Sequence, residues 1–254
     1  MNILIDIGHP AHVHIFKNLA WILIKKGHNI LFTTRDKEYE IQLLNKYGFN
    51  FKSFGKNKKS ILGKIFGLVY FDLRLIFVSL KFKPDLYLSH GSPYAAQVSW
   101  LFRKPHIALE DTGNIEQIKL YLPFTDTILT SYSYKLKHGI KQIYYDGYHE
   151  LAYLHPNRFT PDSSILDLLG VQKDEKYIIL RFVSWNASHD VGQSGLSNEM
   201  KHKVVKELSK YAKVFISSEG ELPDDLKTYQ IKIPPEKMHD ALAFATLFVG
   251  EGAT

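Results

Sequence analysis

Short apolar runs alternate with longer amphipathic stretches along the first 145 residues of the chain. The first run, from Ile3 to Ile7, begins almost at the N-terminus, and a helix-like stretch follows it directly. This order favours parallel strands, because each parallel pair must be joined by a crossover of a dozen residues or more, usually a helix. The sequence therefore predicts an α/β fold with a doubly wound, Rossmann-like parallel sheet that helices cover on both faces.

The rhythm breaks around residues 148–162, where prolines occur without clear periodicity, and a second cycle of the same kind then begins. We predict an N-terminal domain over residues 1–155, a linker over residues 156–172 and a partial C-terminal domain over residues 173–254. The predicted strands span residues 2–7, 28–34, 49–54, 85–89, 105–110, 126–130 and 142–145, then 177–183, 213–217, 229–233 and 246–249. The predicted helices span residues 13–26, 36–47, 61–82, 93–103, 115–121 and 132–138, then 166–169, 197–211 and 235–245.

The last nine residues, from Thr246 to Thr254, are typical of a buried strand that runs into a Gly-rich turn. Such a turn normally leads into a helix whose N-terminal amides hold an anion. No helix follows in this sequence. We therefore expect the second Rossmann-like domain to be incomplete and the native polypeptide to continue beyond Thr254.

Composition narrows the class of protein. Of the 254 residues, 45% are hydrophobic and 23% charged, which is usual for a globular chain with a sizeable core. The chain contains no cysteine, which excludes disulfides, thiol catalysis and thiolate metal sites and fits a reducing compartment. The N-terminus carries no secretory signal pattern. We expect a cytoplasmic protein, either free or peripheral to the inner face of the membrane.

The net charge of +6 raises the question of a polyanionic partner. Basic residues are spread along the chain without a nucleic-acid-binding motif, so no nucleic-acid partner is expected. Four lysines between residues 56 and 64 adjoin an apolar helical stretch, and residues 56–82 therefore suit docking on an anionic membrane. The alternative is a buried helix behind a solvated lysine loop. Charged residues interrupt the stretch, which is too short to span a bilayer.

The segment after the first predicted strand contains a glycine and three histidines. Gly8 allows a tight turn, and the amides of the following helix suit a negatively charged substrate group. His9 is a candidate general base or substrate contact, because imidazole titrates near neutral pH, and His12 is a weaker candidate. The alternative is a structural or helix-capping role. No metal site is expected here, since His9, His12 and His14 lack an i, i+4 pair and a nearby carboxylate.

Polar residues also follow two later predicted strands. His90, Gly91 and Ser92 come after one strand, and Glu110 and Asp111 end the next. Because parallel strands present their carboxyl ends at one edge of the sheet, these side chains are expected to share a crevice. We predict catalytic roles for His90 and Glu110 and substrate contacts for Ser92 and Asp111. The alternative for Asp111 is a turn and a helix cap.

In the second domain, the densest polar loop follows a predicted strand. Arg181 offers a planar fork suited to phosphate oxygens, and Ser184, Asn186 and Ser188 add neutral donors. The Gly-rich turn at residues 250–254 belongs to the same sheet edge, so the two together predict a nucleotide diphosphate site. The alternative is an ordinary polar loop with an arginine salt bridge. The turn residues expected to bind substrate are Gly250, Glu251, Gly252 and Thr254.

Three motifs together resemble a known family: the segment 5–14, the segment 181–190 and the segment 249–254. They are similar to a bacterial and archaeal family known as domain-of-unknown-function family 354, and the resemblance covers essentially the whole chain. That family is more distantly similar to two-domain glycosyltransferases of the B fold and to non-hydrolysing UDP-N-acetylglucosamine 2-epimerases. Members usually continue past the final Gly-rich turn.

The resemblance implies roles for single residues. The turn at Gly8 and His9 looks like the first-strand loop of lipid-linked N-acetylglucosaminyltransferases, and His90-Gly91 and Glu110 look like two sites of the epimerases. Ser92 stands where the epimerases have an aspartate, and their His-Arg-Arg-Glu segment is missing near residue 181, which counts against epimerisation. Residues 147–150 resemble the interdomain hinge. Residues 234–238, with Met238, resemble the loop that packs on the base.

The resemblance implies a metal-independent B-fold glycosyltransferase without a cofactor. It would transfer a sugar from a nucleotide sugar, expected to be UDP-linked, to a cell-envelope glycan or lipid-linked acceptor. His9 or Glu110 would deprotonate the acceptor hydroxyl, while backbone amides and Arg181 stabilise the departing diphosphate. Two alternatives stay open: a 2-epimerase-like enzyme and a nucleotide-sugar-binding module without catalysis.

Overall fold

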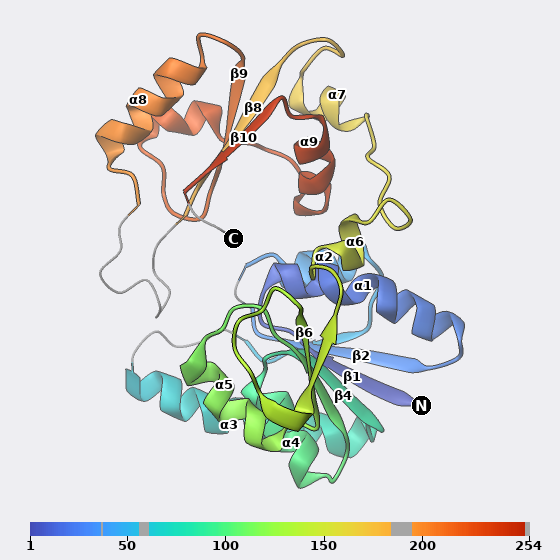
Figure 1. Cartoon of the computed structure of the whole chain (residues 1–254). Helices are drawn as coiled ribbons and strands as arrows, with labels where there is room; N and C mark the ends of the chain where they lie inside the picture. Colours follow the sequence, from blue (N-terminus) through green and yellow to red (C-terminus); the bar gives the residue numbers. More distant parts are fainter. Residues whose placement is uncertain (37, 56–60, 184–194, 252–254) are drawn as a thin grey trace. The chain divides into compact units, whose positions relative to one another are not determined.

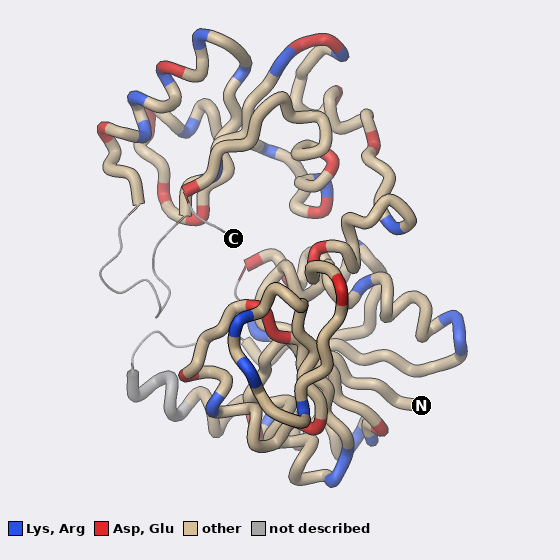
Figure 2. Tube along the Cα trace, in the orientation of Figure 1, with Lys and Arg blue, Asp and Glu red and all other residues tan. Residues whose placement is uncertain are grey.

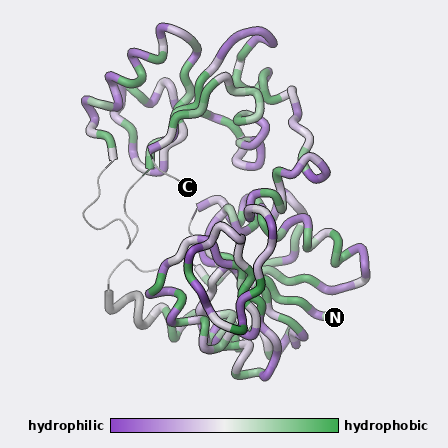
Figure 3. The backbone as a smooth tube through the Cα atoms, in the orientation of Figure 1, coloured by the Kyte–Doolittle hydropathy of each residue, from purple (hydrophilic) through white to green (hydrophobic). Residues whose placement is uncertain are grey.

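The computed structural model describes residues 1–36, 38–55, 61–183 and 195–251, and for residues 61–66 it describes the backbone alone. The chain divides into two compact units, Met1–Phe159 and Thr160–Thr254, each with its own parallel sheet (Figure 1). Apolar segments follow the strands of both units (Figure 3), whereas Lys and Arg are scattered along the traces (Figure 2). Among the described helices, none is long and apolar enough to cross a membrane.

The N-terminal unit contains a seven-stranded sheet in the order β3-β2-β1-β4-β5-β6-β7, with every neighbouring pair parallel. The seven strands predicted for this part of the sequence are present, and the α/β class is confirmed. The strands are β1 (Asn2–Asp6), β2 (Asn29–Thr34), β3 (Phe51–Ser53), β4 (Leu86–His90), β5 (His106–Leu109), β6 (Thr127–Ser131) and β7 (Gln142–Tyr145).

Helices cover both faces of this sheet. Ile3, Ile5 and Ile7 of the first strand segment face one core, together with α1 and α2, whereas Leu4 faces the other core, together with α3 and α4. The alternation follows from the two-residue period of a strand. The helices are α1 (Pro10–Lys25), α2 (Glu40–Lys46), α3 (Ile61–Phe82), α4 (Pro93–Leu101), α5 (Ile115–Tyr121) and α6 (Leu151–Leu154), with 3₁₀ turns at Leu122–Phe124 and Gly139–Lys141.

The order of the strands reverses between β1 and β4. The chain moves from β1 to β2 and β3 on one side and then continues from β4 to β7 on the other. Helix α1 follows β1 onto one face, and α4 follows β4 onto the opposite face. Open α/β sheets carry their binding sites at the carboxyl ends of the strands beside such a switch point.

The helix predicted over residues 132–138 is wrong. The amide of Ser133 donates to Oγ of Ser131, and the amide of Tyr134 donates to the Ser131 carbonyl, so the chain makes a tight turn instead. A serine hydroxyl competes with helical hydrogen bonds in this way. Sequence periodicity alone did not reveal this local competition.

The C-terminal unit contains a three-stranded parallel sheet in the order β10-β8-β9. The strand predicted over residues 229–233 is wrong, because the described chain has only an isolated bridge there, between Ile216 and Gln230. Pro234 and Pro235 lack amide donors, which ends pairing at this point. The elements are α7 (Ile165–Leu169), β8 (Tyr177–Phe182), α8 (Asn198–Leu208), β9 (Lys213–Ser218), α9 (Met238–Phe244) and β10 (Leu247–Gly250), with 3₁₀ turns at Asp224–Tyr229 and Pro235–Lys237.

Candidate active site

Asp6 is the last residue of β1 and is fully buried at the switch point. Its carboxylate accepts hydrogen bonds from Nη1 of Arg35, from Oγ1 of Thr33 and from Oγ of Ser92. Ser92 also caps α4, because its Oγ accepts from the amide of Ala95. These bonds give Ser92 a structural position, and its predicted role in substrate binding stays untested.

Gly8 follows β1 and is closely confined. A Cβ at this position would lie 2.9 Å from Nη2 of Arg35, so a larger residue would displace the guanidinium. The amide of Gly8 donates to Nδ1 of His12 at 3.2 Å. This amide is therefore engaged within the chain, and the predicted role of Gly8 in substrate binding stays untested.

His9 occupies the capping position of α1. Its Nδ1 accepts a hydrogen bond from the amide of Ala11 at 3.2 Å, and its Nε2 lies 3.9 Å from Glu38. The helix-capping alternative considered for this residue is thus what the structure displays. Proton abstraction by Nδ1 would break the cap, which weakens His9 as a candidate base.

His12 stacks on His90, with ring centroids 4.5 Å apart and ring planes inclined by 24°. Burial, together with the charges of His90, His9 and Arg35, holds the pKa of His12 well below its usual range. His12 is therefore uncharged at neutral pH and is able to sit beside His90 without repulsion.

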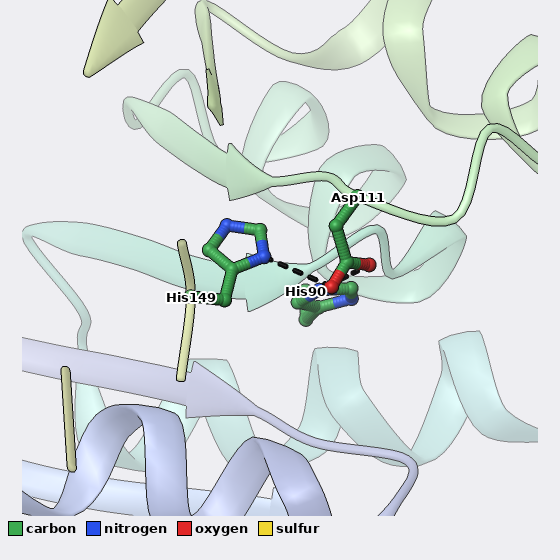
Figure 4. A group of neighbouring side chains, drawn as sticks. All are labelled: His90, Asp111 and His149. Atoms are coloured by element: carbon green, nitrogen blue, oxygen red, sulfur yellow. Dashed lines mark ion pairs between the residues drawn. The ribbon is translucent and has the colours of Figure 1, made fainter. Parts of the chain in front are cut away.

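Asp111 brings two histidines together at the sheet edge (Figure 4). Its Oδ1 lies 3.1 Å from Nε2 of His90, and its Oδ2 lies 3.1 Å from Nδ1 of His149. The imidazoles are almost fully buried, whereas the side chain of Asp111 is 42% exposed. Burial raises the pKa of Asp111, but the adjacent imidazoles of His149 and His90 outweigh it and leave the pKa well below its usual range. Asp111 therefore stays a carboxylate.

The sequence analysis did not single out His149 as a site residue. It lies in the turn between β7 and α6, within the segment compared with an interdomain hinge. The feature of the sequence that could have revealed it is a histidine, followed by Glu150, shortly after β7, the last strand of the N-terminal sheet. Its distance along the chain from Asp111 hides the pairing until the sheet order is known.

The carboxylate of Glu110 makes hydrogen bonds with other residues than those that contact its neighbour Asp111. Its Oε1 accepts from the amide and hydroxyl of Thr112 and from the amide of Gly113, at 2.8 to 2.9 Å, and its Oε2 accepts from the Tyr121 hydroxyl. The residue is 2% exposed. Four hydrogen bonds to one carboxylate favour a structural role, so Glu110 is a poor candidate for proton abstraction.

A cleft of about 420 Å³ adjoins Asp111 and His149 within the N-terminal unit. Ser131, Tyr134 and Tyr145 contribute hydroxyl groups to its lining. Hydroxyls and carboxylates can exchange hydrogen bonds with a sugar, and aromatic rings can pack against its apolar face. A sugar bound in this cleft would lie beside Asp111 and His149.

The C-terminal unit has a separate cavity of about 320 Å³ at the ends of β8 and β10, lined in part by Arg181, Gly250 and Glu251. Arg181 pairs with Glu219 and approaches Oγ of Ser217 at 3.4 Å, as the salt-bridge alternative proposed. Met238 begins α9 and is half-buried. Ser184, Asn186, Ser188, Gly252 and Thr254 lie outside the described residues, so their predicted roles are untested.

Glu251 follows β10 and has backbone partners. Its Oε2 accepts from the amide of Val183 at 2.8 Å, and its Oε1 accepts from the amide of Leu196. Its carboxylate is committed to the chain, so a direct contact with substrate is a prediction that these bonds do not support.

Comparison with known proteins gives matches along the whole chain. Residues 1–254 match the model of a family described as protein of unknown function (DUF354). The uncharacterized protein MJ0665 of Methanocaldococcus jannaschii is 26% identical over 269 residues, covering 100% of this chain and 77% of that protein.

Solved structures of two enzyme classes share the fold. The UDP-GlcNAc 2-epimerase of Methanocaldococcus jannaschii has a TM-score of 0.67 at 11% identity and covers 99% of this chain and 79% of its own. The Neisseria meningitidis UDP-GlcNAc 2-epimerase bound to UDP-GlcNAc has a TM-score of 0.60 at 14% identity, covering 100% and 72%. The Streptomyces sp. SF2575 glycosyltransferase SsfS6 has a TM-score of 0.55 at 13% identity, covering 98% and 76%. The two Rossmann-like units therefore have the fold of B-type glycosyltransferases and these epimerases.

Proposed function

The chain belongs to the DUF354 family, and we propose that it is a B-fold glycosyltransferase that transfers a sugar from a UDP-linked donor to a glycan or lipid-linked acceptor. The observation that carries this proposal is the group of His90, Asp111 and His149, two of which line a cleft at the carboxyl edge of the N-terminal sheet. The UDP-linked donor is supported by the relatives of shared fold, one of which holds UDP-GlcNAc.

His90 is assigned as the general base in place of His9 and Glu110. Nε2 of His90 lies 3.1 Å from Oδ1 of Asp111, and a proton held on Nε2 would leave Nδ1 as the basic nitrogen. A carboxylate that holds an imidazole in one tautomer and stabilises its charged form is the arrangement used in hydrolytic triads. His149 contacts the second carboxylate oxygen and positions Asp111. The acceptor hydroxyl would lose its proton to His90 as the new glycosidic bond forms.

The donor diphosphate is assigned to the C-terminal cavity. Arg181 stands at the end of β8 with its guanidinium shared between Glu219 and Ser217, and the strand end at Gly250 lines the same cavity. An arginine fork can bind phosphate oxygens and stabilise the charge that develops on the leaving group. Binding of the diphosphate would compete with Glu219 for Arg181.

A second candidate function is 2-epimerisation, which the TM-score of 0.67 with an epimerase favours over the 0.55 with SsfS6. Elimination and re-addition need acid and base groups on the sugar. Of the residues compared with epimerase positions, Ser92 and Glu110 are bound to Asp6 and to the Thr112 turn. Transfer needs one base, which His90 supplies, so transfer remains the first proposal.

A lipid-linked acceptor is supported by the outer face of α3. Val69, Leu73, Phe77 and Leu80 are 49 to 62% exposed and recur every three or four residues, so they form an apolar stripe along one side of the helix. Phe71 and Leu75 on the other side are buried. We assign this stripe to shallow contact with an anionic membrane, since four lysines between residues 56 and 64 precede it in the sequence.

The test is a binding and turnover panel with the purified protein. Titration calorimetry with UDP-GlcNAc, UDP-glucose, UDP, GDP and CDP should give binding to uridine nucleotides, and UDP release should require an added glycan or polyprenyl-linked acceptor. His90→Gln should lower turnover at least about 100-fold while leaving UDP affinity unchanged. A mixture of UDP-GlcNAc and its epimer without acceptor would replace the proposal with epimerisation. Nucleotide binding without any turnover would leave a binding module.

A further inference from the structure

The group at the edge of the N-terminal sheet contains three metal-ligand side chains from three separate segments. His90 ends β4, Asp111 follows β5, and His149 lies before α6. Each offers one ligand atom, and the three atoms lie within 4.8 Å of one another. Figure 4 shows the carboxylate of Asp111 between the imidazoles. The fold, rather than a local sequence motif, assembles the group.

The separations suit a shared ion. The distances from Asp111 to Nε2 of His90 and to Nδ1 of His149 are both 3.1 Å. Nitrogen and oxygen ligands bound to one zinc ion at roughly 2.0 to 2.2 Å in a tetrahedral arrangement lie roughly 3.4 Å apart. Small side-chain adjustments would therefore bring the three atoms around one ion.

His149 provides an independent indication of a ligand. Neither of its buried ring nitrogens makes a hydrogen bond of normal geometry with the described residues, although Nδ1 lies 3.1 Å from the Asp111 carboxylate. Leaving buried polar groups without such partners destabilises the folded chain. An ion on Nδ1 would give this nitrogen a partner in the direction of Asp111.

We propose that His90 Nε2, the Asp111 carboxylate and His149 Nδ1 bind a divalent transition-metal ion of the zinc type. Two imidazoles and one carboxylate favour zinc and similar ions over magnesium or calcium, which prefer oxygen ligands throughout. Three protein ligands would leave a coordination position open. Asp111 is 42% exposed and lines the cleft with His149, so a ligand in the cleft would have access to the ion.

The ion would act on the oxygen that occupies the open position. A bound hydroxyl loses its proton more readily, because the cation stabilises the alkoxide. This use of the ion rests on the proposed transferase function. With Nε2 of His90 as a metal ligand, His90 would no longer act as the base, and the proton of the coordinated hydroxyl would pass to water. Metal binding itself is independent of that function and is measured without substrate.

The experiment uses protein without a histidine tag, stripped with a chelator and dialysed. Zn²⁺ is titrated in competition with a chromophoric chelator, and Co²⁺ is titrated while its visible absorption is recorded. One equivalent should bind, and Asp111→Asn or His149→Gln should weaken binding at least 100-fold. His202→Ala is the matched control, because His202 and Asp225 form a surface pair, at 2.7 Å, in the C-terminal unit. This variant should bind as the wild type does.

Absence of a Co²⁺ spectrum in the wild type, or affinity unchanged by Asp111→Asn, would overturn the metal site. If circular dichroism shows that the variants do not fold, the metal site is tested by the wild type alone, through its Zn²⁺ stoichiometry and its Co²⁺ absorption spectrum. Sugar transfer by the metal-free protein would also remove the ion from the mechanism while leaving the transferase in place. Metal binding without sugar transfer on any donor and acceptor would remove the transferase function while leaving the metal site in place.

Discussion

Arg35 and Asp6 form a buried ion pair in which one nitrogen, Nη1, lies 2.8 Å from both carboxylate oxygens. The pair joins the ends of β1 and β2 beneath the Gly8 turn. Because Asp6 also accepts from Ser92, it connects the strand ends to the start of α4. The geometry of the switch point therefore depends on a charge pair that water scarcely reaches.

Replacing one member of this pair leaves the other charge buried. Arg35→Met should lower the free energy of unfolding by about 3 to 5 kcal/mol, measured by urea denaturation. Asp6→Asn combined with Arg35→Met should recover part of the loss. Lys104→Met is the control, since Lys104 and Asp85 form a half-exposed pair at 3.8 Å whose loss should change stability by less than about 1 kcal/mol. Equal effects at the two sites would contradict the argument.

Gly91 separates His90 from the cap of α4 and has a φ of 57°. An added Cβ would lie 3.2 Å from Oε2 of Glu110 and 3.2 Å from the Tyr121 ring. Gly91→Ala should therefore destabilise by about 2 to 4 kcal/mol, combining backbone strain with this crowding. Gly48→Ala, at a φ of 72° in open space, should show only the backbone part, about 1 to 2 kcal/mol. Similar unfolding midpoints for both variants would remove the packing contribution.

His106 is fully buried between Oγ of Ser89 and Oγ1 of Thr125, each 2.9 Å from a ring nitrogen. Burial lowers its pKa from 6.5 to about 3. The folded state therefore binds fewer protons than the unfolded state between these values, and the stabilisation present above pH 6.5 is lost as the pH falls toward 3. This residue should contribute a slope of about 1.4 kcal/mol per pH unit. Between pH 7.5 and pH 5 the wild type should therefore lose about 2 kcal/mol more stability than His106→Gln in urea denaturation, because only the interval below pH 6.5 contributes. Equal losses of stability in the two proteins would contradict the argument.

Removal of the Arg181 guanidinium should weaken binding of the nucleotide diphosphate by the protein. Arg181→Ala is expected to weaken UDP binding at least tenfold in calorimetry, and Arg181→Lys should recover only part, because a lysine cannot bind two oxygens in one plane. Glu219→Gln is the control, since it breaks the ion pair but retains the fork. This variant should bind UDP as tightly as the wild type or more so. Unchanged affinity in Arg181→Ala would remove the assignment.

The apolar stripe on α3 should mediate binding to anionic vesicles. Phe77→Ser combined with Leu73→Ser should reduce sedimentation with phosphatidylglycerol vesicles at least tenfold, because buried apolar area supplies much of the binding energy of interfacial helices. Tyr211→Ser serves as the control, because Tyr211 is also exposed but lies in the C-terminal unit. Equal sedimentation of all variants would exclude the stripe as the contact.

The sequence predicted the strands of the first sheet well, because buried parallel strands form short apolar runs such as the one from Ile3 to Ile7. It could not decide between Glu110 and Asp111, which follow β5 as neighbours. Successive side chains near a strand end point in opposite directions, and only the packing shows that Tyr121 lies on one side and the histidines on the other. His149 was missed for a similar reason, since its pairing depends on the order of strands rather than on spacing.

Glu251 binds the amides of Val183 and Leu196, which flank the segment 184–194. Two described positions that lie 13 residues apart in the sequence are therefore held by one carboxylate. Part of the conformational entropy of bringing these two positions together is thus lost on folding. Replacing Glu251 would release Val183 and Leu196 together, so an effect on the proposed diphosphate site would arise without a direct contact between this carboxylate and the ligand.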